Sequence, residues 1–451
     1  MTVFAKVLVA NRGEIALRII RACRELGIAT VAAHSTADAE SLPVRLADEA
    51  VRIGPAAARQ SYLSIPNIIG AARKTGADAI HPGYGFLSED PYFAEICQQH
   101  GITLIGPPPG VMDVLGDKAR TRRVMRDAGL PLLPGTLSPV ASAGEAERIA
   151  DEIGYPVIIK ASAGGGGSGI TVVRDRESLP SALAETRATA QTLFKDPSVY
   201  LEKYLSPAHH VEIQVVCDSH GGAVHLGERD CSVQRRNQKL VEEAPSPRVG
   251  DDLRARMGRA AVDGAVAAGY QGVGTAEFLL DDDGEFWFME VNPRIQVEHP
   301  VTELVTSLDL VREQIRVAAG ERLSVRQQDV RMRGHAVECR VNAEDPDRGF
   351  AATPGTIEQY VAPGGPGVRV DSHCFPGCTV PPNYDSMIAK LLVWAEDRDR
   401  ALDRMGRALD EYRVEGRGMA TTIGFHREVV DHPVFRDGAA GTDFVRQLRD
   451  G

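Results

Sequence analysis

The chain has 451 residues, a formal net charge of −11 at pH 7 and seven cysteines. A single hydrophobic core rarely grows beyond about 250–300 residues, so this length predicts two to four domains. The acidic balance, with no basic tail or stripe, argues against nucleic acid as the main partner. The cysteines include no Cys-x-x-Cys pair, and no apolar run approaches the ~20 residues of a membrane helix. We therefore expect a cytoplasmic, multidomain protein that binds neither nucleic acid nor membrane.

Strands and helices alternate through the first hundred residues. An apolar strand over residues 4–10 precedes a helix over 15–26, which Gly27 ends. The unit repeats as a helix over 64–74, a strand over 77–80, a helix from Asp90 to Gly101 and a strand over 102–105. This alternation indicates a parallel sheet covered by helices on both faces, whose ligands bind at the carboxyl ends of strands. Tyr84 lies in a loop at such an end, where it fits either ligand stacking or simple loop packing.

A glycine-rich loop follows a change of composition near Gly106. A strand ending in Lys160 runs into residues 164–169 and then into a second strand over 170–173. A Rossmann fingerprint must open a helix and a Walker A motif needs Gly-Lys-Ser/Thr, so neither motif applies here. A strand that ends in an ammonium and turns through glycines can close over phosphates with its backbone N–H groups. A plain disordered loop has the same composition.

The segment from Gly274 to Pro300 carries the pattern in which we place the chemistry. Two strand-like runs, 276–280 and 285–291, flank Asp283-Gly284, a pair that favours a two-residue hairpin turn. That register pairs Asp282 with Glu285, Leu280 with Trp287, and Glu277 with Glu290. Opposed carboxylates repel by up to about 1 kcal/mol on a solvated surface, and by more where water is excluded. A positive group should therefore lie between them.

Polar residues after this hairpin complete a candidate metal site. Alternation in an extended chain places five of them on one face: Glu290, Asn292, Arg294, Gln296 and Glu298. Pro293 indicates that this tail is an edge or a loop. The two carboxylates of Glu277 and Glu290 and the amide oxygen of Asn292 suit a hard cation such as Mg²⁺. The alternative is an ordinary half-buried hairpin with a solvated polar face.

Further polar patterns lie on either side of the hairpin. Alternating sets on predicted strand faces are His210, Glu212 and Gln214, and later Glu338, Arg340 and Asn342. The cationic run 234–239 indicates an anion site, although such runs are usually solvated. His373, Cys374 and Cys378 fit a metal site or, more simply, packed thiols. Two amphipathic helices are expected to end the chain.

Five long segments, in order, carry motifs of one known family. They are Val9–Cys23, His81–Glu89, Glu228–Arg236, Arg294–Glu303 and Gly334–Arg340. The chain resembles biotin carboxylase, an ATP-grasp enzyme, over essentially its whole length. The resemblance implies an α/β protein in three parts: an N-terminal doubly wound parallel-sheet (pre-ATP-grasp) domain at 1–115, an ATP-grasp domain at 116–330 with a mobile glycine-rich lid at about 132–204, and a C-terminal α+β domain at 331–451.

The resemblance also implies roles for individual residues. ATP would contact Lys118, Lys160, Gly165, Gly166, Gly167, Glu202, Lys203, Leu205, His210, Gln234, Asn237, Glu277 and Glu290. Two Mg²⁺ or Mn²⁺ sites would use Glu277, Glu290 and Asn292. Bicarbonate would bind Lys239, Arg294, Gln296 and the Val297 backbone with Glu298 as its base, and Arg340 would stabilise the biotin enolate near Tyr84 and Asp385. The catalytic set is Lys239, Arg294, Glu298 and Arg340, and a family-type homodimer contact would involve Arg18, Arg21, Glu25 and Arg369.

The implied reaction is the ATP-dependent carboxylation of biotin by bicarbonate, through carboxyphosphate. The sequence contains no Met-Lys biotin attachment site and no carboxyltransferase region, so we expect a separate biotin carboxyl carrier protein and separate carboxyltransferase subunits. The final acyl acceptor is left open.

Three positions depart from the family pattern. The family commonly has His at Asn237, Arg at Ser168 and Gly at Ala163, so ATP affinity, lid closure or turnover could differ. Two alternative functions remain: another ATP-grasp ligase that joins a different acid to an amine or thiol, and a catalytically silent assembly subunit.

Overall fold

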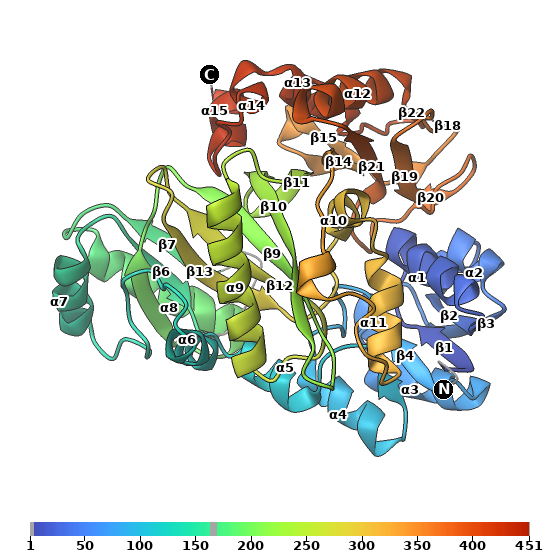
Figure 1. The fold of residues 1–451 in the computed structure, drawn as a ribbon, viewed down its shortest axis with the longest axis horizontal. Helices are drawn as coiled ribbons and strands as arrows, with labels where there is room; N and C mark the ends of the chain where they lie inside the picture. The colour runs from blue at the N-terminus through green and yellow to red at the C-terminus, as the bar shows by residue number, and fades with distance from the viewer. Residues whose placement is uncertain (1–3, 163–168, 451) are drawn as a thin grey trace.

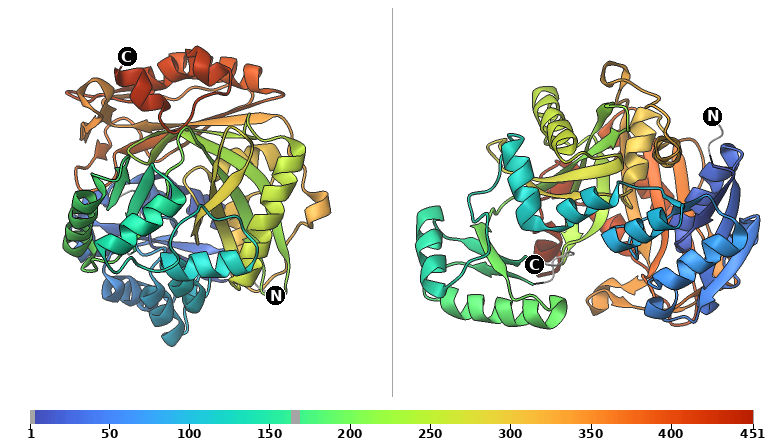
Figure 2. Two further views of the ribbon diagram at one scale, coloured as in Figure 1. Left: turned by 90° about the vertical axis from the view of Figure 1, so that its left-hand side faces the viewer. Right: turned by 90° about the horizontal axis from the view of Figure 1, so that it is seen from below.

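The computed structural model describes residues 4–162 and 169–450, which fold around three main β-sheets (Figure 1). A five-stranded parallel sheet lies at the N-terminal side, a large eight-stranded antiparallel sheet runs through the middle, and a small three-stranded sheet stands at the far side (Figures 1 and 2). None of the helices in these residues has the length and apolar character needed to cross a membrane. The expected cytoplasmic location stays a prediction.

The N-terminal part is the doubly wound parallel sheet that the alternation predicts. Its elements are β1 (Lys6–Val9), α1 (Gly13–Glu25), β2 (Ala29–Ser35), α2 (Leu42–Leu46), β3 (Glu49–Gly54), α3 (Ile65–Thr75), β4 (Ala79–His81), α4 (Pro91–Gln99) and β5 (Thr103–Leu104). The strand order is β3-β2-β1-β4-β5, all parallel. Val7 and Val9 pack with Ile19 of α1, whereas Leu8 packs with Phe93 of α4 on the opposite face. Strand β3 was not predicted, because its residues are largely exposed and its apolar pattern is short.

The small sheet belongs to the segment that the family resemblance makes the lid. Two helices, α5 (Pro109–Gly116) and α6 (Lys118–Asp127), precede this segment, whose elements are α7 (Ala143–Ile153), β6 (Val157–Ala161), β7 (Ile170–Val173), α8 (Leu179–Phe194) and β8 (Val199–Lys203), with strand order β7-β6-β8. The predicted strand at 170–173 is confirmed. Ala163, Gly165, Gly166, Gly167 and Ser168 lie outside the described residues.

The eight-stranded sheet joins the central and C-terminal regions. Its strands and covering helices are β9 (His209–Cys217), β10 (Ala223–Arg235), β11 (Gln238–Ala244), α9 (Asp251–Ala267), β12 (Gly272–Leu280), β13 (Phe286–Asn292), α10 (His299–Thr306), α11 (Leu310–Ala318), β14 (His335–Asn342), β19 (Val368–Ser372) and β21 (Met387–Ala395). The order is β13-β12-β9-β10-β11-β14-β21-β19. The sequence pattern over residues 199–217 predicts a pair of adjacent strands; this was wrong, because β8 pairs with β6 in the small sheet and β9 pairs with β10 and β12. Since β11 pairs with β14, one sheet continues across the expected boundary near residue 330.

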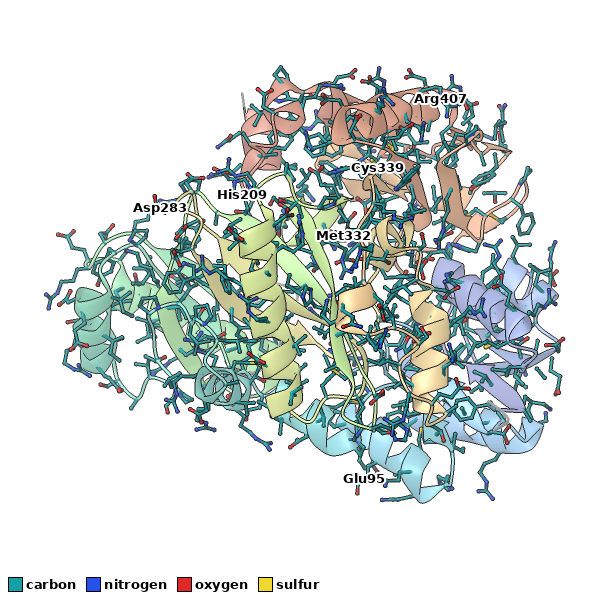
Figure 3. All side chains as sticks on the ribbon, viewed as in Figure 1. Glu95, His209, Asp283, Met332, Cys339 and Arg407 are labelled. Carbon is teal, nitrogen blue, oxygen red and sulfur yellow. The ribbon has the colours of Figure 1, made fainter. Side chains whose placement is uncertain are left out.

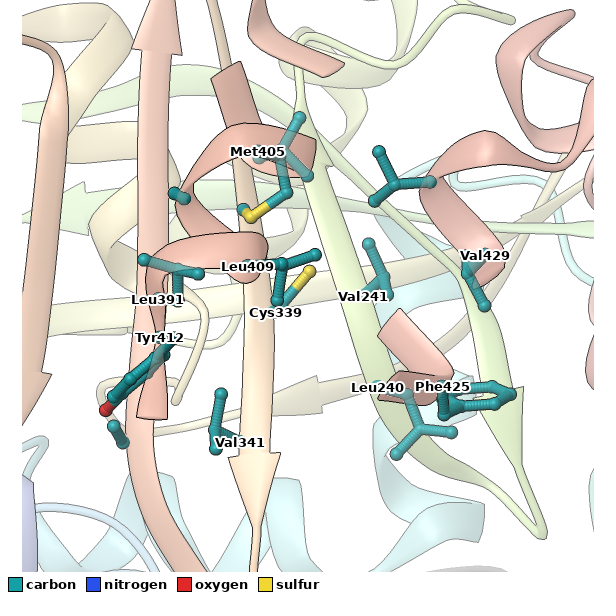
Figure 4. Close-up of a cluster of buried hydrophobic side chains, with 14 of the residues drawn as sticks. Leu240, Val241, Cys339, Val341, Leu391, Met405, Leu409, Tyr412, Phe425 and Val429 are labelled. Atoms are coloured by element: carbon teal, nitrogen blue, oxygen red, sulfur yellow. The ribbon is translucent and has the colours of Figure 1, made fainter. Parts of the chain in front are cut away.

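The C-terminal part packs helices on one face of this sheet. Its remaining elements are β15 (Glu344–Asp345), β16 (Ala351–Ala352), β17 (Gly355–Thr356), β18 (Gln359–Val361), β20 (Thr379–Val380), α12 (Arg398–Glu411), β22 (Arg413–Glu415), α13 (Ile423–Asp431), α14 (Pro433–Arg436) and α15 (Phe444–Asp450). In the described part of the chain, four helices follow β21, where two were predicted. Val241, Cys339 and Leu391, from three neighbouring strands, pack beneath Met405 and Leu409 of α12 (Figure 4).

We expect Leu391→Ala to destabilise the protein by about 2–5 kcal/mol, because it opens a cavity at a fully buried core position. The matched control is Val361→Ala, at a position 48% exposed, which should cost less than about 0.5 kcal/mol. Urea unfolding followed by circular dichroism measures both. Equal losses in the two variants would contradict this packing.

Candidate active site

The β12–β13 hairpin ends in three loop residues rather than two. The backbone N–H of Asp281 donates to the carbonyl of Glu285 (3.0 Å), which leaves Asp282, Asp283 and Gly284 in the loop (Figure 3). Gly284 has φ +80, the left-handed backbone typical of this loop length. The predicted two-residue turn was therefore wrong.

The extra loop residue changes the register near the tip but not at the acidic pair. Leu280 faces Phe286 and Leu279 faces Trp287, so the predicted pairing of Leu280 with Trp287 was wrong. A register shift after Glu277 makes β13 contribute one extra residue, and Glu277 faces Glu290 as predicted. The extra loop residue moves the strand register by one residue, and the extra residue at the bulge moves it back. The predicted Glu277–Glu290 pair is therefore correct although the predicted turn was wrong.

Among the described residues no cationic side chain contacts both Glu277 and Glu290, so the prediction of a positive group between them was wrong for the protein's own side chains; separate cations lie against each carboxylate. The Glu277 carboxylate contacts Lys239 Nζ (3.0 Å) and His210 Nε2 (3.1 Å), and Asn292 Nδ2 donates to it (2.8 Å). Burial would raise the pKa of Glu277, but Lys239 and His210 hold it well below its ordinary value. Burial and the negative charge of Glu277 raise the pKa of Glu290, whose nearest cation is Lys118 Nζ, 3.8 Å away.

This acidic pair fits a divalent cation. The Glu290 side chain is 39% exposed and faces the cavity, next to an ionised and buried Glu277. A cation between the two carboxylates would remove the repulsion that raises the pKa of Glu290. A tighter set, His210, Glu212 and Glu277, also brings its ligand atoms together, but the Lys239 ammonium already bonds both of its carboxylates.

Lys239 is the centre of the buried charges beneath this pair. Its Nζ contacts Glu212 (2.5 Å), Glu277 (3.0 Å) and Glu298 (2.7 Å), which come from β9, β12 and the residue before α10. Despite burial, these carboxylates raise the pKa of Lys239 well above its ordinary value. Arg229, fully buried, holds Glu212 from behind (2.5 Å).

Glu298 is the acid that two cations enclose. It is fully buried, Lys239 bonds one of its oxygens, and Arg340 Nη2 donates to the other (2.8 Å). Burial would raise its pKa, but the two cations hold the pKa of Glu298 well below its ordinary value. Two cations that keep a carboxylate ionised also make it a weak base. It accepts a proton more readily from a group beside the same cations, because they stabilise the charge that the group gains.

A single cavity of about 1290 Å³ brings the predicted residues together. It is lined by Tyr84, Lys118, Lys160, Lys203, Leu205, His210, Gln234, Asn237, Lys239, Glu277, Glu290, Asn292, Arg294, Gln296, Val297, Arg340 and Asp385. Glu202 lies behind it, 3% exposed, with its carboxylate bonded by Lys160 (2.5 Å) and Arg122. Glu298 is fully buried and bonds Lys239 and Arg340, which line the cavity.

The cavity floor positions Arg294 and Tyr84. Arg294 contacts Glu89 (2.9 Å) and donates from Nη1 to Gln296 Oε1 (2.9 Å). The Tyr84 hydroxyl donates to Glu14, so the ring is fixed rather than loosely packed.

Three matches with known proteins cover nearly the whole chain. Residues 3–112 match the family description "Biotin carboxylase, N-terminal domain", residues 117–326 "Carbamoyl-phosphate synthase L chain, ATP binding domain", and residues 338–447 "Biotin carboxylase C-terminal domain". A biotin carboxylase from Nostoc sp. is 54% identical over 99% of both chains.

The chain belongs to the biotin carboxylase family.

Two further relatives show the range of this family. One is a pyruvate carboxylase component from Methanothermobacter thermautotrophicus, which is 54% identical over 99% of this chain and 91% of its own length. The biotin carboxylase domain of 2-oxoglutarate carboxylase from Hydrogenobacter thermophilus, solved as a dimer with MgADP, ADP and bicarbonate, is 48% identical. Its structure matches with a TM-score of 0.95 over 100% of this chain and 98% of that one.

The departure at Asn237 has a local structural explanation. Arg236 and Asn237 are the two residues of the β10–β11 turn, with φ +49 and +62. A two-residue turn with both values positive favours Asn, whose short polar side chain tolerates this backbone. The side chain is exposed and lines the cavity, so the chain has a neutral amide there.

The predicted dimer residues divide into two groups. Arg18 and Arg369 both bond Glu303 (2.8 Å each) within the chain, and Arg18 is 8% exposed. Arg21 and Glu25 are exposed. All four residues remain predictions for a dimer contact.

His373, Cys374 and Cys378 fit packed thiols better than a metal site. All seven cysteines are free, and in the described residues no group of three ligand atoms includes His373, Cys374 or Cys378.

Several residues that build the site were not predicted to belong to it: Glu14, Glu89, Arg122, Arg229 and Glu242. Most lie inside motifs of the family, but no local alternation marks them as neighbours of the cavity. A signal was present for Glu212, which alternates with His210 on the predicted strand.

We expect Arg229→Met to destabilise the protein by about 3–5 kcal/mol, because it leaves the buried carboxylate of Glu212 without its guanidinium. Arg148→Met is the control: its pair with Glu152 is 62% and 64% exposed and should be worth less than about 1 kcal/mol. Thermal unfolding of the two variants would show the contrast, and a small effect at Arg229 would rule out this role.

Proposed function

We propose that the chain uses ATP and bicarbonate to carboxylate biotin on a separate carrier protein, giving carboxybiotin, ADP and phosphate. The observation that carries the proposal is Glu298, a fully buried carboxylate held between Lys239 (2.7 Å) and Arg340 (2.8 Å) at the edge of the cavity. Membership of the biotin carboxylase family and the bicarbonate and MgADP bound by the Hydrogenobacter domain support it.

The cations of the cavity position ATP. Lys118 begins α6, where Asp117 caps the helix, and Lys160 lies near the end of β6, so the two ammonium groups approach from different elements. Lys203 is fixed by the carbonyl groups of Gly154 (2.9 Å) and Tyr155 (3.1 Å). Phosphoryl transfer depends mainly on positioning and on neutralising charge, and fixed cations supply both.

Glu277, Glu290 and Asn292 would hold Mg²⁺ or Mn²⁺ against the phosphates. The metal supplies positive charge to the phosphate oxygens during transfer. The protein contributes two carboxylates held in register by one strand pair and an amide whose nitrogen bonds Glu277.

Bicarbonate binds beside Lys239, Arg294 and Gln296. Glu298 accepts the bicarbonate proton, one bicarbonate oxygen attacks the γ-phosphorus, and the bond from phosphorus to ADP breaks. Lys239, one of the cations that hold the pKa of Glu298 low, also lies beside the bound bicarbonate. As the proton moves, the attraction of Lys239 is shared between Glu298 and the substrate.

Arg340 acts in the second half of the reaction. Carboxyphosphate breaks into CO₂ and phosphate, the phosphate takes the proton of biotin N1, and N1 then bonds the carbon of CO₂. The negative charge that deprotonation places on the ureido oxygen is stabilised by a fixed guanidinium beside it. Arg340 is fixed by Glu242 (2.5 Å) and Glu298, while Tyr84 and Asp385 line the same cavity.

Partners follow from the reaction. The carboxybiotin product needs a carboxyltransferase, and biotin arrives on a biotin carboxyl carrier protein; a homodimer is part of the proposal. The acyl acceptor is undecided, since the Nostoc biotin carboxylase and the Methanothermobacter pyruvate carboxylase component are equally similar at 54% identity.

We expect Glu298→Gln to lower bicarbonate-dependent ATP hydrolysis by about 10²–10⁴-fold, because the amide cannot accept the proton. Arg340→Ala should lower carboxybiotin formation by about 10²–10³-fold through loss of charge stabilisation. Arg348→Ala, an exposed position near β14, serves as control. Hydrolysis that is equally fast without bicarbonate would contradict the proposal.

The same assay separates the two alternatives. Another ATP-grasp ligase would release ADP faster with a different nucleophile and show no response to free biotin. A silent assembly subunit would form no carboxybiotin at all.

We expect Glu290→Gln to raise the Mg²⁺ concentration for half-maximal activity by about tenfold or more, because the site loses one of its two charges. Glu285→Gln, exposed before the same strand, is the matched control and should leave the Mg²⁺ dependence unchanged. Identical metal titrations for the two variants would place the metal elsewhere.

A further inference from the structure

Glu242 and Glu338 lie side by side on a buried face of the large sheet. They are directly opposite one another in the antiparallel pair β11–β14, and both are fully buried. Opposed residues of this kind have Cβ atoms about 4.5–5.5 Å apart, so two ionised carboxylates would repel strongly without water to screen them. Neither group contacts substrate in the proposed mechanism.

Their hydrogen bonds leave a partner missing. Glu242 Oε1 accepts from Arg340 Nε (2.5 Å), but Glu242 Oε2 and both oxygens of Glu338 have no partner among the described residues. Buried polar atoms are nearly always hydrogen-bonded, and an ionised buried carboxylate without a partner costs several kcal/mol. A proton on one carboxyl group turns it into a donor and removes one of the two opposed charges.

The nearby cations are committed elsewhere. Arg340 is shared between Glu242 and Glu298, the latter approaching from the start of α10. Lys390, opposite Arg340 on β21, bonds Glu14 (3.0 Å). Lys390 also donates to the carbonyl of Val297 (2.9 Å), so its charge acts on Glu338 without a hydrogen bond to it.

We propose that Glu242 and Glu338 share one proton, and that this protonated pair is a positioning element for Arg340. Only one negative charge then faces the guanidinium from the sheet, and Arg340 keeps positive potential toward the cavity. The positioning role rests on the proposed function, in which Arg340 stabilises the biotin enolate. The shared proton does not depend on that function.

The pKa values of both carboxyl groups are shifted upward, the direction that this geometry predicts. Burial raises the pKa of Glu338 well above its ordinary value of 4.5; Lys390 and Arg340 oppose this shift, and Glu242 and Glu298 add to it. Burial raises the pKa of Glu242 to about 7, opposed by Arg340. The folded protein therefore keeps a proton that the unfolded chain releases above pH 4.5, so stability falls as pH rises from there to the pKa of the pair. Glu338→Gln should remove this part of the slope.

Infrared spectroscopy of the full-length chain at pH 7 tests the shared proton directly. The wild-type protein should show a carboxylic-acid C=O band that Glu338→Gln lacks. The matched control is Glu243→Gln: Glu243 is also buried, but His335 and Arg398 bond it (2.7 Å each), and its pKa is lowered, so it is ionised already. An unchanged set of bands in Glu338→Gln would overturn the proposal.

The pH dependence of kcat/KM for biotin carboxylation tests the consequence for Arg340. The alkaline limb should move by at least about one pH unit in Glu338→Gln, because an amide cannot ionise. Glu243→Gln should keep the wild-type limb, and Glu242→Gln should lower activity about tenfold or more, since Arg340 loses a fixed charge partner. An identical limb in Glu338→Gln and wild type would refute the positioning role.

Two features keep the outcomes separable. If Glu338→Gln fails to fold, Glu242→Gln should lose the same infrared band, because its amide donates to Glu338 and removes the need for the proton. If the wild-type chain does not carboxylate biotin, the proposed function fails, while the infrared result still decides whether the proton is shared.

Discussion

The ammonium of Lys239 is the group on which the active site depends. It is 11% exposed and bonds three carboxylates that come from separate parts of the chain: Glu212, Glu277 and Glu298. Without the cation, three like charges would share a space from which water is largely excluded. With it, Glu298, the proposed base, and Glu277, a proposed metal ligand, are held ionised before any substrate arrives. The site therefore needs little reorganisation when bicarbonate binds.

A two-faced sheet makes this arrangement possible. On β14, Cys339 and Val341 point into the C-terminal hydrophobic core (Figure 4). Glu338 and Arg340 alternate with them and face the charged groups Glu242 and Glu298. The same strand thus anchors Arg340 in a rigid core and presents it to the cavity. Because β14 pairs with β11, Arg340 reaches Glu298 across a sheet that is continuous between the central and C-terminal regions.

Local pattern predicted the parts of this structure that depend on neighbours in sequence. The parallel N-terminal sheet follows from alternating apolar segments, and the Glu277–Glu290 pair follows from a hairpin. The turn was wrong because three loop residues and a compensating bulge leave the same distant pairing. Contacts such as Arg229 with Glu212 or Arg340 with Glu242 depend on which strands pair in the sheet. Hydrophobic periodicity within one segment does not predict that pairing. The glycines expected over the phosphates lie outside the described residues.

In the proposed reaction Glu298 frees a bicarbonate oxygen to attack ATP, and oxygen isotope transfer measures the new oxygen–phosphorus bond directly. With bicarbonate labelled in all oxygens, the purified chain, biotin and MgATP should yield phosphate carrying one labelled oxygen, and Glu298→Gln should slow label transfer and turnover together. Turnover that leaves the phosphate unlabelled would contradict the account.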